Sequence, residues 1–393
     1  MRKIMTGKKI VIHDYAGHPF QLDLSIALAK NGFEVFHIYT SSSGGPKAGF
    51  EREISNLKII NFEVSNINKS NFVKRYFQEQ DYGLKLVKKI NQINPDIVIS
   101  ANTPLTAQNN LCNWCRKNDK KFIFWLQDII SVAASSILVK KIGFLGKIVS
   151  WYFEYLERKI LNKSDAIVSI CDQFNDILAK WNINTKSYVI PNWAPIKEMP
   201  MHDKNKEWLK KHNINQKFVC LYSGTMGMKH NPDVILDAAK KISNQEDIVF
   251  VIISEGEGAN YLKENKKKYN LKNMMILPFQ KFSDLPMIFG CSDVLITILE
   301  DDAGVFSVPS KLWSYYCSGK PSILSVPKDN LTALITNQYK TGLVSTDKDI
   351  VDLIIKIKQN KNQIANKMGA NARSYAEENF HIDSILEKFL NVL

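Results

Sequence analysis

Short apolar runs that alternate with helical stretches constrain the fold of this chain more than any other feature. Lys9–His13 is such a run, a turn containing Gly17 follows it, and Phe20 to Lys30 carries apolar residues at helical spacing. A second apolar run at 33–39 completes a strand–helix–strand unit. Strands that alternate with helices predict a parallel sheet with helices on both faces.

The same scheme occurs in both halves of the chain. Further apolar runs lie at 96–100, 122–125, 166–170, 187–190, 217–222, 248–253, 274–277, 294–299 and 321–325. We therefore predict an α/β protein with two Rossmann-like domains in tandem, joined near 190–195 and followed by the polar stretch 197–216. The expected domains are residues 1–195, residues 196–375, and a final helix within 376–393 that is free to pack back on the first domain.

A net charge of +13 indicates polyanionic partners, which are nucleic acid, an anionic membrane surface or phosphorylated substrates. The alternative is a general contribution of the charge to solubility. Nucleic acid is disfavoured as a partner because the aromatic residues are not interleaved with Lys or Arg in any single motif. Failure to bind RNA or DNA at moderate salt would dispose of that class.

The cysteines and the N-terminal residues indicate a reducing, cytoplasmic compartment. Cys112 and Cys115 form a lone CxxC pair, so a zinc site is not expected, and the other cysteines lie in or beside apolar runs. The first 17 residues lack the long apolar core of a signal peptide, which favours a first strand. No stretch reaches the roughly 18 uninterrupted apolar residues of a membrane-spanning helix.

Three segments of the second half follow predicted strands and are expected at one edge of its sheet, where open parallel sheets bind ligands. They are 223–229, 254–258 and 300–311. In the last, Ser307 or Val308 is expected to cap a helix whose first turn contains Pro309. Amides near Ser310 and Lys311 would then face an anion.

Lys311 and Lys229 would add positive charge at this edge, which predicts a phosphate site. The alternative is an ordinary capped helix with a surface lysine. The glycines fit neither GxGxxG nor GxxxxGK[ST], so hydride transfer and ATP hydrolysis lose their usual support.

Several segments together are similar to a known family. They are His13–Gly17, Trp125–Asp128, 190–195, 223–232, 254–258, 302–311 and Ser318–Pro321. With them the chain resembles bacterial glycosyltransferases of family 4, in the colanic-acid, O-antigen and capsule branch that includes the L-fucosamine transferase type. The resemblance implies a GT-B fold, in which two facing Rossmann-like domains enclose a cleft.

The resemblance also implies an activity. A hexosyl or N-acetylhexosaminyl group would move from a nucleotide-diphosphate sugar, most often a UDP-sugar, to a polyprenyl-diphosphate-linked saccharide of a growing surface polysaccharide. The anomeric configuration is usually retained in this family, and no metal or other cofactor is expected. Lysines and helix amides would then stabilise the leaving diphosphate in place of a cation.

Donor contacts are implied for Gly17 in the first half, and for a larger set in the second half where Thr225 replaces the usual partner arginine. That set is Gly224, Thr225, Lys229, Glu255, Gly256, Pro278, Phe279, Ser310 and Lys311. Asp128 is similar to the residue beside the sugar, although Gln127 stands where many members have His. His18 or His13 is the imidazole expected near acceptor or donor, with a structural role as the alternative.

One departure from the family pattern concerns two glutamates that many members carry eight positions apart. The corresponding positions here are Phe306 and Ser314, so no carboxylate is available there. Either Glu300, Asp301 or Asp302 takes over the sugar contacts, with Asp302 as the catalytic candidate, or the chain is a catalytically inactive relative that serves as a binding subunit in polysaccharide assembly.

The stretch Ile130–Phe153 is apolar, aromatic and basic, and it contains no acidic residue. Such a composition suits a helix that lies in a membrane interface, which would place the protein peripherally on the anionic inner leaflet near a lipid-linked acceptor. The alternative is that these residues pack between the domains.

Overall fold

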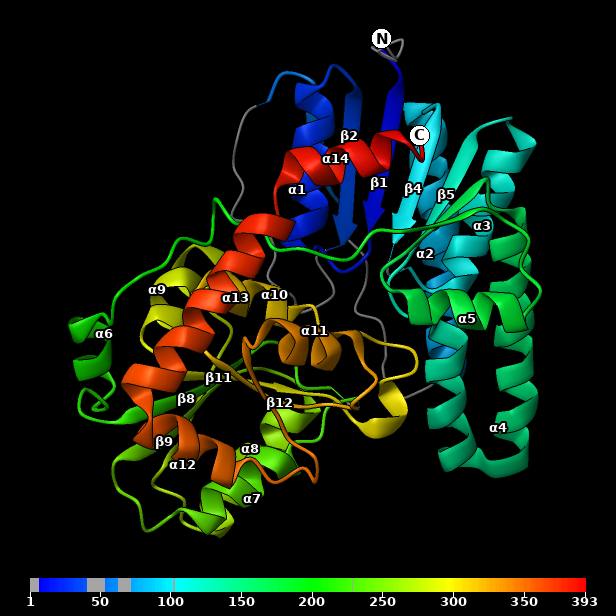
Figure 1. Cartoon of the computed structure of the whole chain (residues 1–393). Coiled ribbons are helices and arrows are strands. Elements are labelled where there is room, and N and C mark those ends of the chain that lie inside the picture. Colours follow the sequence, from blue (N-terminus) through cyan, green and yellow to red (C-terminus); the bar gives the residue numbers. More distant parts are fainter. Residues whose placement is uncertain (1–6, 41–53, 63–71, 102, 228) are drawn as a thin grey trace. The chain divides into compact units, whose positions relative to one another are not determined.

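A computed structural model describes residues 7–40, 54–62, 72–101, 103–227 and 229–393 (Figure 1). Met228, in the expected turn 223–232, lies outside these residues. The chain forms two compact units, Met1–Pro191 with Ile382–Leu393, and Asn192–His381. Each unit is built on its own parallel sheet, which confirms the α/β class with two Rossmann-like domains.

The first unit contains seven parallel strands in the order β3-β2-β1-β4-β5-β6-β7. The inner strands are buried along most of their length, as expected when helices cover both faces of a parallel sheet. The strands are β1 (Lys9–Asp14), β2 (Glu34–Thr40), β3 (Leu57–Phe62), β4 (Ile97–Ala101), β5 (Lys121–Leu126), β6 (Ala166–Ser169) and β7 (Ser187–Val189).

The helices of the first unit are α1 (Pro19–Lys30), α2 (Phe72–Ile93), α3 (Leu105–Lys117), α4 (Ile130–Lys163), α5 (Asp172–Lys180) and the C-terminal α14 (Ile382–Leu390). Helix α14 packs against α1. The Phe389 ring lies 4.9 Å from the Trp125 ring, and Lys121 Nζ donates to the backbone oxygen of Val392 at 2.7 Å. These contacts fix the C-terminal segment on the first unit.

The second unit contains six parallel strands in the order β10-β9-β8-β11-β12-β13. They are β8 (Phe218–Ser223), β9 (Ile248–Ile253), β10 (Met274–Leu277), β11 (Val294–Ile298), β12 (Ser322–Ser325) and β13 (Gly342–Val344). Its α-helices are α6 (Lys206–Lys211), α7 (Asp233–Lys241), α8 (Glu257–Lys268), α9 (Leu285–Gly290), α10 (Lys311–Cys317), α11 (Leu331–Tyr339), α12 (Val351–Gln359) and α13 (Asn366–Asn379).

Two edge strands, β3 and β13, were not predicted from the sequence. Strand β3 is exposed or only partly buried along its length, and β13 has three residues, so neither carries a continuous apolar run. The expected boundary at residues 375 and 376 falls inside α13, because Tyr375 packs against Trp313 of α10 and the helix continues to Asn379. The expected join overlaps the start of the second unit at Asn192.

Helix α4 is a hairpin of two helical arms. Ile142 and Gly143 have non-helical dihedral angles, and Gly143 has a φ of 55°, so the chain reverses there (Figure 1). Gly146 lies so close to the first arm that an added Cβ would be 2.3 Å from the Leu138 oxygen. Among the helices in the described parts of the chain, none is both long and apolar enough to cross a membrane.

Candidate functional site

The turn after β8 begins with Gly224, whose φ of 131° is one that residues with a side chain rarely adopt. Its amide donates to the Ile253 oxygen at the end of β9, 3.0 Å away. An added Cβ would stand 3.2 Å from Cε and 3.3 Å from Nζ of Lys311. The two segments expected at this edge therefore meet, and the glycine leaves room for the lysine. Thr225, the next residue, is exposed.

Lys311 is anchored on the aromatic end of β8. Its ammonium donates to the Tyr222 hydroxyl and lies 3.8 Å from the centre of that ring. Tyr315, one turn further along α10, accepts from the Ser223 amide at 2.8 Å and donates to the Ser223 oxygen at 3.0 Å. Burial and the charge of Lys229 lower the pKa of Lys311 well below its usual value. This ammonium would be stabilised by an anion.

Lys229 joins the turn after β8 to the loop after β11. Its Nζ donates to Ser307 Oγ at 2.7 Å, and its backbone oxygen accepts from the Glu300 amide at 3.0 Å. His230, the next residue, accepts from the Gly227 amide at 3.1 Å through Nδ1. Burial and the nearby charges of Lys311 and Lys229 lower the pKa of His230 well below its usual value, so the ring is neutral.

The helix after β11 begins later than the sequence predicts. Lys311 is its first residue and Ser310 its N-cap, so Pro309 lies before the helix and not in its first turn. The prediction that Ser307 or Val308 caps it is wrong, because the Ser307 hydroxyl receives the lysine and its backbone oxygen accepts from Asn330 Nδ2 at 2.9 Å. Two first-turn amides of α10, those of Leu312 and Trp313, donate to the backbone oxygens of Pro309 at 3.2 Å and of Ser310 at 3.1 Å.

A second group of expected donor residues gathers after β9 and β10. The carboxylate of Glu255 accepts from the Phe279 amide at 3.2 Å, which brings the loop after β9 to the segment that contains Pro278. Gly256 has a φ of 104° and caps α8. The Gly258 amide donates to the Met226 oxygen at 3.1 Å, so this loop also touches the turn after β8.

The carboxylates considered as replacements for the missing glutamates have different surroundings. Lys348 Nζ lies 3.3 Å from Glu300 and 2.9 Å from Asp301. Asp302 is exposed in the short 3-10 helix Asp301–Ala303. Phe306 is buried, so its position serves packing. Lys348 therefore partly neutralises both Glu300 and Asp301.

The corresponding turn of the first unit follows β1, and its backbone amides donate to the carboxylate of Asp14 at the end of that strand. Asp14 is fully buried and accepts from the amides of Ala16, at 3.1 Å, and His18. His18 Nδ1 lies 3.4 Å from Asp14 Oδ1. Burial opposes ionisation, but the neighbouring His18 outweighs it and holds the pKa of Asp14 below its usual value. Gly17, with a φ of 72°, permits this turn.

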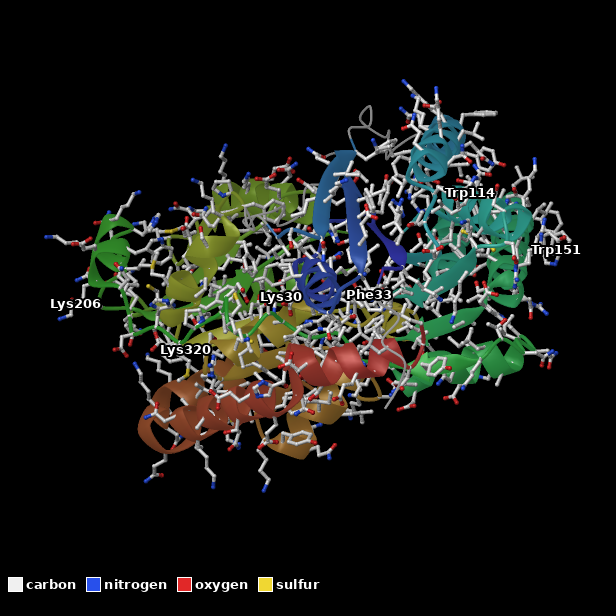
Figure 2. All side chains as sticks on the ribbon, turned by 90° about the horizontal axis from the view of Figure 1, so that it is seen from above. Lys30, Phe33, Trp114, Trp151, Lys206 and Lys320 are labelled. Carbon is white, nitrogen blue, oxygen red and sulfur yellow. The ribbon has the colours of Figure 1, made fainter. Side chains whose placement is uncertain are left out.

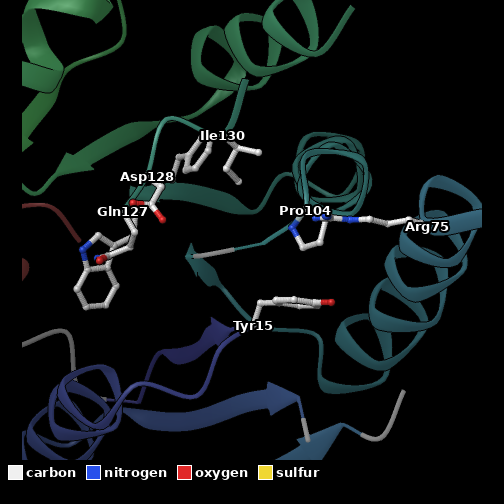
Figure 3. A pocket seen from close by; sticks show the side chains of 8 residues that line it. Tyr15, Arg75, Pro104, Gln127, Asp128 and Ile130 are labelled. Atoms are coloured by element: carbon white, nitrogen blue, oxygen red, sulfur yellow. The ribbon is translucent and has the colours of Figure 1, made fainter. Parts of the chain in front are cut away.

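Asp128 lines a pocket of about 190 Å³ in the first unit (Figure 3). Arg75 reaches from α2 toward Pro104, and Asp128 follows the end of β5 (Figure 3). The described lining residues are Tyr15, Arg75, Pro104, Phe124, Trp125, Gln127, Asp128 and Ile130, a set that does not include Gly17 or His18. The carboxylate, the guanidinium and the phenol together suit a polar, charged ligand.

Buried polar groups form hydrogen bonds between the strands and helices of this unit. His13 Nε2 lies 2.5 Å from the Tyr82 hydroxyl and Nδ1 lies 3.0 Å from Ser100 Oγ. Burial lowers the pKa of His13 to about 3, so this imidazole is neutral and structural. Glu157 accepts from the Ser131 amide at 2.9 Å at the start of α4. Burial raises the pKa of Glu157 to about 7, although these hydrogen bonds oppose the shift.

The sequence did not point to Tyr222, His230 or Tyr315 as parts of the site, and it assigned Ser307 a capping role where the structure shows a contact with Lys229. Tyr222 and Tyr315 lie in apolar runs, which are typical of core residues. For His230, its position next to Lys229 in the sequence was a signal that it belongs to the site. Within the described ranges no group of three or more His, Cys, Asp or Glu side chains is placed to hold a metal ion.

Two family models match the chain, one in each half. The glycosyltransferase family 4 model matches residues 20–198, and the model of glycosyl transferases group 1 matches residues 204–375. The two domains follow one another in the chain, as the two structural units do.

Two curated relatives match about half of the chain. Glycosyl transferase WcaI of Escherichia coli (strain K12), named for colanic acid biosynthesis, is 23% identical over 240 residues, which are 60% of this chain and 58% of the relative. UDP-Gal:alpha-D-GlcNAc-diphosphoundecaprenol alpha-1,3-galactosyltransferase of Escherichia coli is 27% identical over 214 residues, 52% of each chain. The chain thus spans just over half the length of these relatives.

The fold is shared with solved structures over nearly the whole chain. Anabaena Alr3699/HepE, solved in complex with UDP-glucose, superposes with a TM-score of 0.71 at 13% identity, covering 98% of this chain and 100% of that one. At this identity the likeness shows the fold alone. The architecture is GT-B, with two Rossmann-like domains.

Proposed function

We propose that this chain, a family 4 glycosyltransferase domain followed by a group 1 glycosyl transferase domain, transfers a sugar from a nucleotide-diphosphate donor to a lipid-linked saccharide. The observation that carries the proposal is the convergence of Gly224, Lys229 and Lys311 at the carboxyl edge of the second sheet. Two neighbouring ammonium groups at this edge suit a diphosphate.

Chemically, the second unit would hold the donor through its phosphates. Departure of the nucleoside diphosphate places negative charge on the β-phosphate oxygens, and Lys311 and Lys229 would stabilise that charge. The amides near Ser310 would act with them. Because these groups do the work of a cation, we expect transfer to continue in the presence of EDTA. Loss of transfer in EDTA, restored by a divalent ion, would contradict the metal-free mechanism.

The finer assignments also rest on the resemblance and the relatives. We propose a UDP-sugar donor, a hexosyl or N-acetylhexosaminyl group, retention at the anomeric carbon and a polyprenyl-diphosphate-linked acceptor of an O-antigen, colanic-acid or capsule pathway. One relative is named for a UDP-Gal donor and a diphosphoundecaprenol acceptor, which supports the first and last of these. All six cysteines are free thiols, which supports a cytoplasmic site.

A thermal-shift panel tests donor binding. The panel contains UDP-, GDP- and dTDP-sugars, including UDP-N-acetyl-L-fucosamine because the sequence resembles that transferase type. A ligand that binds only the folded protein raises the melting temperature, and we expect the UDP-sugars to give the largest shift. The control Lys206→Ala, an exposed position on α6, should respond like wild type. No shift with any nucleotide sugar would refute the proposal.

Transfer to a polyprenyl-diphosphate saccharide separates the enzyme from an inactive relative. The specific observation behind the second candidate is the buried Phe306 at a glutamate position, with Glu300 and Asp301 both beside Lys348. Product formation, with the anomeric configuration read by NMR, identifies an enzyme. Donor binding without hydrolysis or transfer identifies a binding subunit.

A further inference from the structure

The second arm of α4 carries apolar residues on its solvent side. Phe144, Ile148, Trp151 and Tyr155 follow one another at spacings of four, three and four residues, so they form one stripe along the helix, and Leu145 lies beside it. These five residues, here called the outer face, are all exposed, with Phe144 at 75% and Trp151 at 70%. Trp151 lies at the outer edge of its helix in Figure 2.

Next to the turn, the opposite side of the same arm is small and polar. Gly146 and Ser150 are buried, and Ser150 Oγ donates to the Gly146 oxygen at 2.6 Å. Gly146 also meets the first arm at Leu138. A surface helix normally packs its apolar stripe inward and exposes its polar side. Near the turn the order is reversed, so the apolar stripe is exposed among the described residues.

The charge around the hairpin indicates the kind of partner. Between residues 129 and 153 the sequence has three lysines, Lys140, Lys141 and Lys147, and no acidic residue, and Lys147 is exposed beside the outer face. Trp151, Tyr152 and Tyr155 are exposed amphipathic rings of the kind that favours a membrane–water interface. A second copy of the chain docked on the same face would bring Lys147 near its own counterpart, which like-charge repulsion disfavours.

We propose that the outer face of the α4 hairpin docks on an anionic lipid bilayer. Phe144, Leu145 and Ile148, next to the turn, enter the boundary between headgroups and acyl chains. The rings of Trp151 and Tyr155 lie at headgroup level, and Lys147 contacts lipid phosphates. The arm lies in the interface and does not span the membrane. This inference rests on the surface alone and not on the transfer reaction.

Co-sedimentation with vesicles of phosphatidylethanolamine and phosphatidylglycerol tests the proposal. The full chain should bind these vesicles, and binding should weaken as ionic strength rises. The double variant Phe144→Ser/Trp151→Ser removes two exposed rings without disturbing packing, and we expect its vesicle affinity to fall at least about tenfold. Leu334→Ser, at an exposed apolar residue of α11, is the matched control and should bind like wild type.

Thermal melting of both variants establishes that they are folded, and donor binding establishes that the second unit is intact. A folded double variant that binds vesicles as tightly as wild type would overturn the proposal. A wild-type chain that does not bind anionic vesicles would also overturn it. If that chain instead forms dimers and the double variant does not, the outer face binds a second copy of the chain and not a membrane. Vesicle binding without donor binding would leave this inference standing and refute the proposed function.

Discussion

The first strand–helix turn of each unit shows how the same position in the fold can be used in two ways. In the first unit the turn after β1 contains a buried carboxylate, Asp14, which accepts from the amides of Ala16 and His18. These donors are therefore already satisfied within the protein. The turn is stable by itself and does not call for an external anion.

In the second unit the turn after β8 brings cations together. Lys229 and Lys311 lie close enough for each charge to be felt by His230, and the pKa of both Lys311 and His230 is lowered. Lys311 donates to the Tyr222 hydroxyl, which carries no charge to neutralise it, and one contact of Lys229 is the Ser307 hydroxyl. The comparison shows that amide donors of this turn are bonded within the protein in the first unit, whereas the turn of the second unit gathers positive charge.

The largest expected effect comes from removing the charge in the second unit. Lys311→Ala should weaken UDP binding about 10- to 100-fold, because a charge-assisted hydrogen bond contributes about 1.5–3 kcal/mol. Its melting temperature without ligand should equal or exceed that of wild type, since the ammonium is held at a lowered pKa. Calorimetric titration with UDP and thermal melting measure the two. A UDP affinity equal to that of wild type would contradict the role of Lys311 in an electropositive turn of the second unit.

The reciprocal change in the first unit should affect stability and not donor affinity. Asp14→Asn removes the charge that accepts from Ala16 and His18, and we expect a loss of about 2 kcal/mol in the free energy of unfolding at pH 7. Since the pKa of Asp14 is lowered in the folded state, this loss should shrink as the pH falls through and below 3.8. Urea unfolding at several pH values measures it; a large change in UDP affinity would contradict the assignment.

Glu157 is a buried acid of the first unit whose pKa is raised to about 7 from 4.5. The folded state therefore binds an extra proton between these values, so its contribution to stability is present below pH 4.5 and is lost as the pH rises to about 7. Glu157→Gln should remove a pH dependence that approaches about 1.4 kcal/mol per pH unit within this window. Parallel unfolding curves for variant and wild type at every pH would show that Glu157 does not titrate there.

The smallest expected effect concerns the space beside Lys311. Gly224→Ala puts a methyl group 3.2 Å from Lys311 Cε at a φ of 131°, so it should lower UDP affinity about tenfold. Gly227→Ala in the same turn meets no atom within 4 Å among the described residues and is the matched control. Equal affinities for the two variants would mean that the position of Lys311 is unimportant.

The sequence predicted the sheets and the edge that carries the lysines, because buried parallel strands are continuous apolar runs and their carboxyl ends share one edge. That rule relates Gly224 to Lys311 despite their separation in the chain. The contacts of Tyr222 and Tyr315 could not be predicted, since a hydroxyl at the end of an apolar run gives no sign of its partner.

The hairpin shows a different limit of sequence reasoning. The stretch Ile130–Phe153 has the composition of a membrane-interface helix, but Phe144 and Trp151 look like core residues until the reversal at Gly143 places them outward. Exposure depends on how the two arms pack, and that depends on the close approach at Gly146. Composition alone therefore left membrane docking and domain packing as equal alternatives.

Proton uptake on donor binding tests the central claim most directly. A nucleotide sugar has no titrating phosphate near neutral pH, so protons taken up must go to the protein. Calorimetric titration of wild type in two buffers of different ionisation enthalpy, repeated at rising pH from neutral, should show uptake of protons once the pH reaches the lowered pKa of Lys311, and affinity should fall there. Lys311→Ala should show neither effect. Binding of the donor to wild type with no proton uptake and no loss of affinity at any pH up to 10.5, the usual value for lysine, would contradict an electropositive diphosphate site at this edge.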